Sequence, residues 1–440
     1  MIYFVVVLLV FLSSKPLSVF LGISFIKALP YVLLIIGIIQ HGFFNRGYFY
    51  IGRLVNHRSF LIYGIFLCIL LLSFLRDSNN EMSQIGTYTT PLMYLLFVLY
   101  VYLFIVYYRK RTQDFQSFVK QIIFLIILAT SLFISIDIML YLLGVTSGGE
   151  GGETFSVVGS VLGLAIERIN FVLGGHHNNF SLLIGDVIVL TLQALLLGLY
   201  AGSGKRILLV VVIVTGYALI LADVRGVVLS IIISLAFVFL FKKLRVLQLL
   251  PSITFLPFLI SIGFPLIQIL LHSNANSLAA FTRSGEDIFT LNGRTYIWEG
   301  CLVALRSFDF HDLVGYGQVG HITSDAYLEW AWIFPGKVTH NMYFQYILDA
   351  GYLGLLSLLG IIFITAKHAL DLYRAGIKSS LVFLTFLIYF SFSGIFESAI
   401  GVYNHPHTTF FLLISAVVIL LKNEYVVYLN YKTNNITKQV

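Results

Sequence analysis

The sequence predicts an all-α polytopic membrane protein, a single integral membrane domain over residues 1–440 with about twelve transmembrane helices. Hydrophobic residues make up 59% of the 440 residues and charged residues 11%, whereas a soluble domain carries about 25% charged residues. Apolar runs long enough to cross a bilayer, which takes about 20 residues, recur along the whole chain. The one long polar stretch, residues 272–340, falls between the ninth and tenth runs and is predicted to be a large external loop.

The twelve expected spans follow one another with mostly short connections. They are centred on Ile2–Leu12, Pro30–Phe44, Phe60–Leu75, Leu92–Tyr108, Phe118–Leu143, Phe180–Ala201, Ile207–Ala222, Val227–Phe241, Val246–Leu271, Met342–Ala366, Leu381–Phe396 and Thr409–Leu421. The first run is short, but it lacks the basic start and the small-residue cleavage site of a signal peptide, so we interpret it as a retained span.

The basic residues orient the chain. Most of the 27 Lys and Arg residues fall in alternate loops and in the C-terminal tail. The positive-inside rule therefore predicts that both termini are cytoplasmic, as an even number of spans requires. The net charge of +7 is explained by this orientation and does not indicate a nucleic-acid partner.

Two external loops are long. Residues 144–179 contain the acidic, glycine-rich run Gly148–Glu153, followed by Phe155–Leu173, which is expected to form an amphipathic helix at the membrane interface. Residues 272–340 hold all three tryptophans together with arginine, histidine and carboxylate side chains. If the protein carries out chemistry, we expect it in this second loop.

Three external arginines are candidates for binding a phosphate or pyrophosphate. Arg225 lies between two short spans, where it either pairs with Asp223 or snorkels to the interface, or else binds an anion with its bidentate fork. Arg294 precedes a predicted short helix, Thr295–Arg306, and Arg283 lies further upstream in the same loop. The sequence does not show whether these side chains converge.

His340 and Asn341 are expected to open the tenth span. A histidine in the first turn of a helix is kept neutral by the helix dipole, so His340 is a candidate general base toward a hydroxyl. The alternative is a structural histidine at the membrane boundary. Asn341 is a candidate for orienting the ring or a sugar.

Other polar residues at external boundaries give weaker signals. The pairs His176-His177 and His405-Pro406-His407 lack the spacing of a metal site, and Cys68 and Cys301 show neither a metal-binding pattern nor a plausible disulfide. We therefore expect no metal and no cofactor. Glu397, at the outer end of the eleventh span, is expected to pair with an arginine in a structural role.

Taken together, these motifs resemble the O-antigen ligase and Wzy-type O-antigen polymerase superfamily. The resemblance rests on the order and spacing of Gly293-Arg294-Thr295-x-x-Trp298, Gly315-Tyr316-Gly317, His340-Asn341 and Gly351-x-x-Gly354, on the Arg225-Gly226 step, and on His177-Asn178-Asn179 at the start of a span. It covers roughly residues 176–365, and the first half of the chain matches in hydropathy alone.

The resemblance implies a GT-C-like membrane glycosyltransferase of the bacterial inner membrane, active on its periplasmic face. Its donor is a glycan on undecaprenyl pyrophosphate, and a chain-length regulator is a candidate partner. By the same resemblance, Arg225 and Arg294 hold the pyrophosphate and His340 activates the acceptor hydroxyl. Further substrate contacts are expected from Arg283, Asn341, Tyr316, His177 and Asn178.

Two alternatives to a polymerase remain. A ligase that transfers the glycan to lipid A-core shares the same motifs. A flippase or transporter of lipid-linked sugars is compatible with twelve spans, but transporters usually carry internal repeats and broken helices at the midplane. Here the ionisable residues gather at one external face, which favours a surface enzyme.

Overall fold

The computed structural model describes most of the chain, and the described part is helical without a β-strand. The described residues are 2–22, 24–44, 58–75, 84–112, 114–145, 169, 171–174, 177–263, 294–305, 309–317, 320–324, 339–398, 400 and 406–437. The longer helices are α1 (Ile2–Phe20), α2 (Leu29–Ile38), α4 (Arg58–Leu75), α5 (Gln84–Arg111), α6 (Phe115–Leu142), α8 (His177–Leu196), α9 (Gly202–Ala222), α10 (Arg225–Lys243), α19 (Met342–Arg374), α20 (Ser380–Ser393) and α21 (Pro406–Thr437). Short helical segments are η1 (Ser24–Ala28), η2 (Ile39–Phe44), η4 (Leu247–Leu249), α11 (Leu250–Ile253), α15 (Arg294–Ala304), α16 (Phe310–Val314) and α17 (Gly320–Thr323).

The described helices confirm a polytopic helical membrane protein, although not a count of twelve spans. Seven of them are long and apolar enough to cross a membrane: Phe25–Gly42, Leu92–Arg109, Phe115–Leu142, Gly202–Ala222, Arg225–Lys243, Met342–Arg374 and Pro406–Val426. Four shorter apolar helices, Ile2–Ser13, Arg58–Ser73, Phe180–Leu196 and Ser380–Ser393, coincide with other expected spans.

The ninth expected span, Val246–Leu271, is broken where the structure describes it. After η4 and α11, a turn at Thr254 and Phe255 interrupts the helix, which resumes over residues 256–263. Pro257 explains the break, because a proline there cannot donate to the carbonyl oxygen of Ile253 and its ring clashes with that carbonyl in an unbroken helix.

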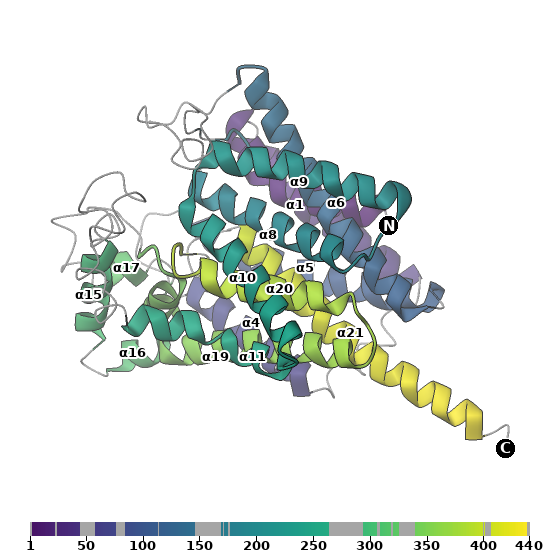
Figure 1. The fold of residues 1–440 in the computed structure, drawn as a ribbon. Coiled ribbons are helices and arrows are strands. Elements are labelled where there is room, and N and C mark those ends of the chain that lie inside the picture. The colour runs from purple at the N-terminus through teal and green to yellow at the C-terminus, as the bar shows by residue number, and fades with distance from the viewer. Residues whose placement is uncertain are drawn as a thin grey trace.

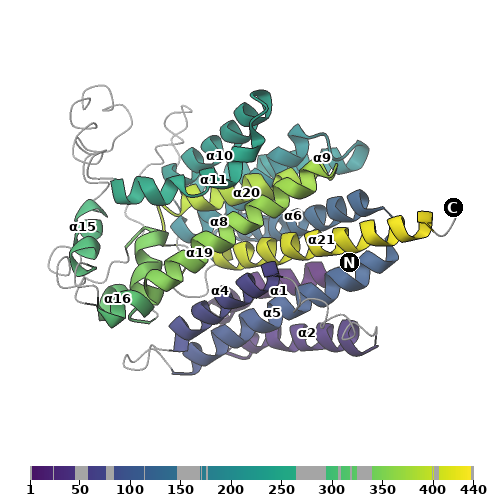
Figure 2. The ribbon, with the colours of Figure 1, turned by 90° about the horizontal axis from the view of Figure 1, so that it is seen from below.

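The core of the bundle is formed by α19, α20 and α21, with α8 and α10 packed on α20, α4 on α19, and α5 on α21 (Figures 1 and 2). Every residue of α20 is buried. Its 14 residues rise about 21 Å at 1.5 Å per residue. An apolar helix this short is surrounded by other helices, so it does not need to match the thickness of a bilayer by itself.

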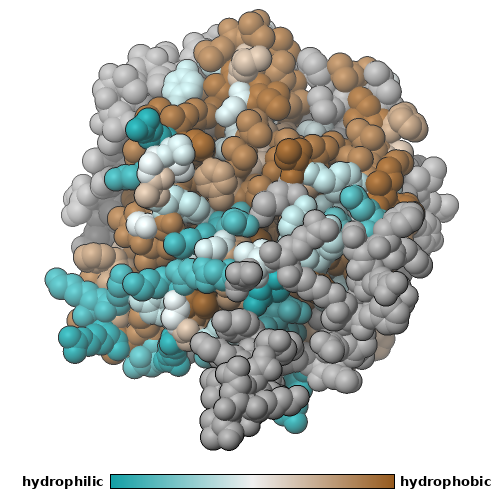
Figure 3. All heavy atoms as spheres, turned by 90° about the vertical axis from the view of Figure 1, so that its right-hand side faces the viewer, coloured by the Kyte–Doolittle hydropathy of each residue, from teal (hydrophilic) through white to brown (hydrophobic). Residues whose placement is uncertain are grey.

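The two ends of the bundle differ in chemistry. The short helices α15, α16 and α17 lie at one end, and both chain termini lie toward the other (Figures 1 and 2). Figure 3 looks onto the end with the termini, where hydrophilic side chains border apolar helix flanks. Basic residues mark that end of several helices and are exposed: Lys205, Arg206, Lys242, Lys243, Arg245, Lys367, Arg374 and Lys378. The distribution of basic residues in the sequence thus corresponds to one end of the bundle.

The long loops are described in part. The interfacial helix expected over Phe155–Leu173 lies mostly outside the described residues. At its C-terminal end, Phe171, Val172 and Leu173 are buried, and the backbone N–H groups of Leu173 and Gly174 donate to the carboxylate of Asp137 at 2.9 and 2.6 Å. This end of the loop is therefore fastened to α6. Of residues 272–340, the structure describes α15, α16, α17 and the residues that flank them.

Candidate functional site

The centre of the candidate site is the turn that ends α20. Helix α20 stops at Ser393, whose carbonyl oxygen accepts the backbone N–H groups of Phe396 at 3.0 Å and Glu397 at 3.2 Å. The carbonyl oxygen of Gly394 accepts the N–H of Met342, the first residue of α19, at 2.7 Å. The turn is thereby joined to the start of α19, and it presents Glu397 between the two helices.

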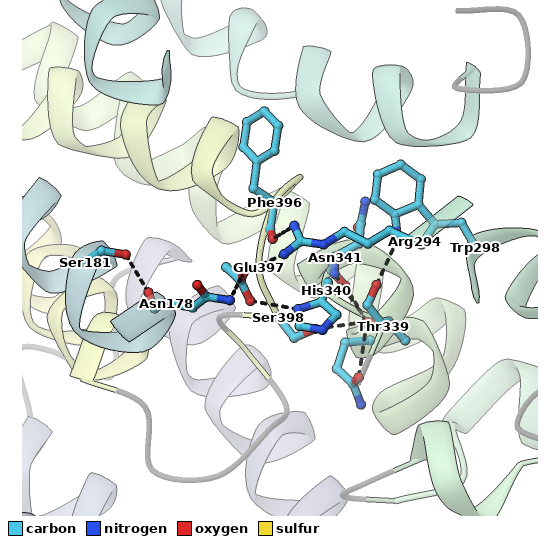
Figure 4. A network of polar contacts seen from close by, with 11 residues as sticks. Asn178, Ser181, Arg294, Trp298, Thr339, His340, Asn341, Phe396, Glu397 and Ser398 are labelled. Carbon is cyan, nitrogen blue, oxygen red and sulfur yellow. Dashed lines mark hydrogen bonds and ion pairs between the residues drawn. The ribbon is translucent and has the colours of Figure 1, made fainter. Parts of the chain in front are cut away.

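Glu397 connects three segments that are far apart in the sequence (Figure 4). Its Oε1 accepts from Nη2 of Arg294 at 3.0 Å and from Nδ2 of Asn178 at 2.7 Å. Its Oε2 lies 3.1 Å from Nδ1 of His340. The carboxylate is 5% exposed, whereas the side chains of Arg294 and His340 are 20% and 21% exposed. A buried anion thus anchors two groups that reach solvent.

Arg294 is the first residue of α15 and points back toward the bundle. Besides the ion pair with Glu397, its Nη1 donates to the carbonyl oxygen of Phe396. One turn later in the same helix, Nε1 of Trp298 donates to the carbonyl oxygen of Thr339 at 2.9 Å. Helix α15 is therefore hydrogen-bonded both to Thr339, the residue that precedes His340, and to the turn that carries Glu397.

His340 lies outside the helix, in contrast to the sequence prediction that placed it in the first turn. Asn341 is the N-cap of α19, and its side chain accepts from the N–H groups of Tyr343 and Phe344. His340 itself has a left-handed backbone, with φ +49°, a conformation that is uncommon for residues other than glycine. The ring consequently faces the Glu397 carboxylate instead of the start of the helix, and the argument from the helix dipole does not apply.

The residue before His340 fixes this conformation. Oγ1 of Thr339 donates to the carbonyl oxygen of Asn341 at 2.9 Å and lies 3.0 Å from Oγ of Ser398 and 3.2 Å from Oε1 of Gln345. Thr339 is fully buried. The segment from Thr339 to Asn341 is thus held from both sides, which positions the imidazole.

The contact between His340 and Glu397 selects one form of the ring. A carboxylate accepts from Nδ1–H, which leaves the Nε2 lone pair available to accept a proton. The arrangement of carboxylate and imidazole is suited to a general base. Arg294 supplies a cation on the same carboxylate.

Arg225 begins α10 beside the same turn. It is half-buried, and it follows Asp223, which has a left-handed backbone with φ +52° and is buried. The next residue, Gly226, packs so closely that a Cβ there would lie 2.6 Å from Cγ of Phe396. The residue that follows Arg225 is therefore packed directly against the turn that carries Glu397.

The Gly315-Tyr316-Gly317 motif is hydrogen-bonded to a kink in α19. Gly351 interrupts that helix with φ +67° and ψ −172°. The carbonyl oxygens of Leu348 and Asp349 accept the N–H groups of Tyr316 at 2.8 Å and Gly317 at 3.0 Å. A second pair of contacts completes the joint: the Asp349 side chain accepts the N–H of Gly320 at 2.7 Å and Nε2 of Gln345 at 2.9 Å.

The remaining candidates differ in their positions. The ring of Tyr316 stacks on His311 at 4.9 Å between centroids. Asn341 is buried, and its Nδ2 donates to Oγ of Ser261 at 2.9 Å, so both of its side-chain polar atoms serve the fold. His177 opens α8. Arg283 lies outside the described residues. The part of the chain that the structure describes contains no group of three His, Cys, Asp or Glu side chains arranged to hold a metal ion.

A second polar network lies inside the bundle. Nδ1 of His407 is 2.8 Å from Oδ2 of Asp186, and its Nε2 is 3.1 Å from Oγ of Ser393. All three residues are fully buried. The carbonyl oxygen of Ser393 also accepts the N–H groups of the turn. This network therefore stabilises the C-terminal end of α20.

The fold and the site together define a polytopic helical membrane protein with a carboxylate that joins an arginine and a histidine at one end of its bundle. Residues 209–359 match the model of the family described as O-Antigen ligase. This match confirms the resemblance to the O-antigen polymerase and ligase superfamily. The matched region includes Arg225, Arg294 and His340, whereas Asn178 and Glu397 lie outside it. A comparison with curated proteins gives no match.

Proposed function

We propose that the protein is a metal-independent membrane glycosyltransferase that polymerises undecaprenyl-pyrophosphate-linked oligosaccharide repeat units into O-antigen or a related surface polysaccharide. The observation that carries the proposal is the joining of Arg294 and His340 through Glu397, within and beside the region that matches the family. The pair offers a cation for a leaving pyrophosphate and a base for an attacking hydroxyl.

The reaction follows from these two groups. Nε2 of His340 takes the proton of the acceptor sugar hydroxyl, whose oxygen forms a bond to the anomeric carbon of the donor. The bond from that carbon to the pyrophosphate oxygen breaks, and its electron pair leaves with undecaprenyl pyrophosphate. Arg294 and Arg225 stabilise the charge that develops on the leaving group. The energy resides in the sugar–pyrophosphate bond, so the proposal requires neither nucleotide nor metal.

The position of the site is compatible with a lipid-linked donor. Helix α20 rises about 21 Å from the end with exposed basic residues, less than the roughly 30 Å of a hydrocarbon core. We therefore place the turn with Glu397 about 9 Å inside the opposite side of that core, where a pyrophosphate reaches the arginines while its polyprenyl chain remains in lipid. His177 and Asn178, at the start of α8, and Tyr316 and Arg283, in the loop, are proposed to contact the glycan.

The topology belongs to the same proposal. We place the protein in the bacterial inner membrane with both termini cytoplasmic and the Glu397 end periplasmic, in a GT-C-like arrangement of twelve spans. Two features support this placement: both termini lie away from α15–α17, and exposed Lys and Arg residues mark the same end. A chain-length regulator remains a candidate partner.

A ligase that transfers glycan to lipid A-core is the second candidate, and it is favoured by the match to the family described as O-Antigen ligase. Purified protein with lipid-linked repeat units as both donor and acceptor distinguishes the two. We expect a ladder of products that differ by one repeat unit. Transfer to added lipid A-core without a ladder would replace the polymerase by the ligase.

A further inference from the structure

The guanidinium that the proposed function assigns to the donor pyrophosphate is already engaged. In the structure, Arg294 donates to the carbonyl oxygen of Phe396 and forms an ion pair with Glu397 at 3.0 Å. Arginine binds a phosphate best through two parallel N–H groups, with its charge uncompensated. Full binding of the pyrophosphate therefore competes with Glu397 for the same cation.

The two carboxylate oxygens of Glu397 bind different partners, and this arrangement allows Arg294 to leave the carboxylate for a phosphate. Oε1 receives both Arg294 and Nδ2 of Asn178, the latter at 2.7 Å. If Arg294 turns to a phosphate, Oε1 keeps the hydrogen bond from Asn178 and the buried carboxylate is not left without a donor. Oε2 still faces Nδ1 of His340.

The release of Arg294 changes what the carboxylate does for His340. While the guanidinium neutralises Glu397, little of the negative charge is available to stabilise an imidazolium. Once the guanidinium has moved to the phosphate, that charge acts on His340 and favours the form that has accepted the hydroxyl proton.

We propose that Glu397 holds Arg294 in the substrate-free protein, and that the donor pyrophosphate displaces it. Glu397 is thus a positioning residue whose exchange of partners couples donor binding to the readiness of His340 as a base. The inference rests on the proposed function, because it takes a pyrophosphate as the ligand of Arg294.

Glu397→Gln separates the two roles. Glutamine has nearly the same size and still offers one oxygen to Asn178 or His340, but it no longer neutralises Arg294. A charge-assisted hydrogen bond is worth roughly twice a neutral one, so we expect the dissociation constant for undecaprenyl pyrophosphate to fall about five- to tenfold. The loss of the charge beside His340 should lower kcat about 100-fold or more.

The experiment measures binding of undecaprenyl pyrophosphate to purified protein in nanodiscs, and kcat from the product ladder. Asp312→Asn is the matched control, because it removes one buried carboxylate from the external region at a helix cap of α16; it should leave binding unchanged. Glu397→Asp is a second variant that keeps the charge on a shorter side chain, and its affinity should lie between wild type and Glu397→Gln. In the Arg294→Gln background, Glu397→Gln should no longer tighten binding.

Tighter binding with a lower kcat supports the inference. Unchanged or weaker binding in both Glu397 variants overturns it, while loss of binding in Arg294→Gln would leave the proposed function standing. A wild-type protein that does not bind undecaprenyl pyrophosphate would overturn both.

Discussion

Replacing Gly315 by alanine tests whether the loop that carries Gly315 must dock on the kink of α19. Gly315 has φ +82° and ψ 169°, and a Cβ there would lie 2.3 Å from the carbonyl oxygen of Asp349. Holding a residue other than glycine in this backbone region costs about 1–3 kcal/mol. The clash also separates two hydrogen bonds, from Tyr316 to Leu348 and from Gly317 to Asp349, worth about 0.5–1.5 kcal/mol each. Together the substitution should destabilise the docked loop by about 2–6 kcal/mol.

Intrinsic fluorescence during heating reports on this loop, because all three tryptophans of the chain, Trp298, Trp330 and Trp332, belong to it. Gly198→Ala is the control, since Gly198 also has a positive φ, +61°, but its Cβ would meet no atom within 4 Å. The midpoint of Gly315→Ala should fall below that of both wild type and Gly198→Ala, and its rate of glycan transfer should fall in parallel. Equal midpoints for the two variants would refute the docking argument.

Two further predictions concern the cation and the topology. Arg294→Lys keeps the charge but loses the planar fork, and the loss of one charge-assisted hydrogen bond, about 1.5–3 kcal/mol, should lower kcat/KM about 10- to 100-fold; wild-type kinetics would exclude Arg294 as the bidentate ligand. The topology can be tested by labelling introduced cysteines in intact spheroplasts with a membrane-impermeant maleimide. The reagent should modify Phe310→Cys, at a position that is 66% exposed, and should not modify Asn435→Cys. Cys301 should stay unmodified because burial raises the pKa of its thiol, and the reverse labelling of the two introduced cysteines would invert the proposed orientation.

The sequence predicted Arg294 and His340 as site residues and an arginine partner for Glu397, but not that Glu397 joins the two. Arg294 and His340 stood out because they are polar residues at the boundaries of apolar runs. Glu397 was expected to pair with an arginine, and the ion pair with Arg294 confirms it. Its position between Arg294, His340 and Asn178 had no local signal, since those partners lie more than fifty residues away along the chain. The available signal was its location, because an ionisable residue at the end of a buried span is costly unless it is paired.

The placement of His340 was wrong and the ninth expected span is broken where the structure describes it, whereas the count of twelve spans stays a prediction. His340 was expected in the first turn of a helix, but the left-handed backbone at His340 and the side-chain cap of Asn341 begin the helix two residues later. The number of spans cannot be read from length alone, because a helix such as α20 is enclosed by its neighbours and does not meet the length of a bilayer. Pro257 was the sequence signal for the break in the ninth expected span, but the apolar run continues across it, so hydropathy alone predicts an unbroken helix.

The measurement that tests the central claim most directly is a single-turnover reaction of His340→Ala with lipid-linked repeat units, compared with wild type at matched donor occupancy. The variant should insert, bind undecaprenyl pyrophosphate like wild type, and transfer glycan about 10²–10⁴-fold more slowly, the usual contribution of a general base. Transfer by His340→Ala at near the wild-type rate would contradict the assignment of His340 as the base.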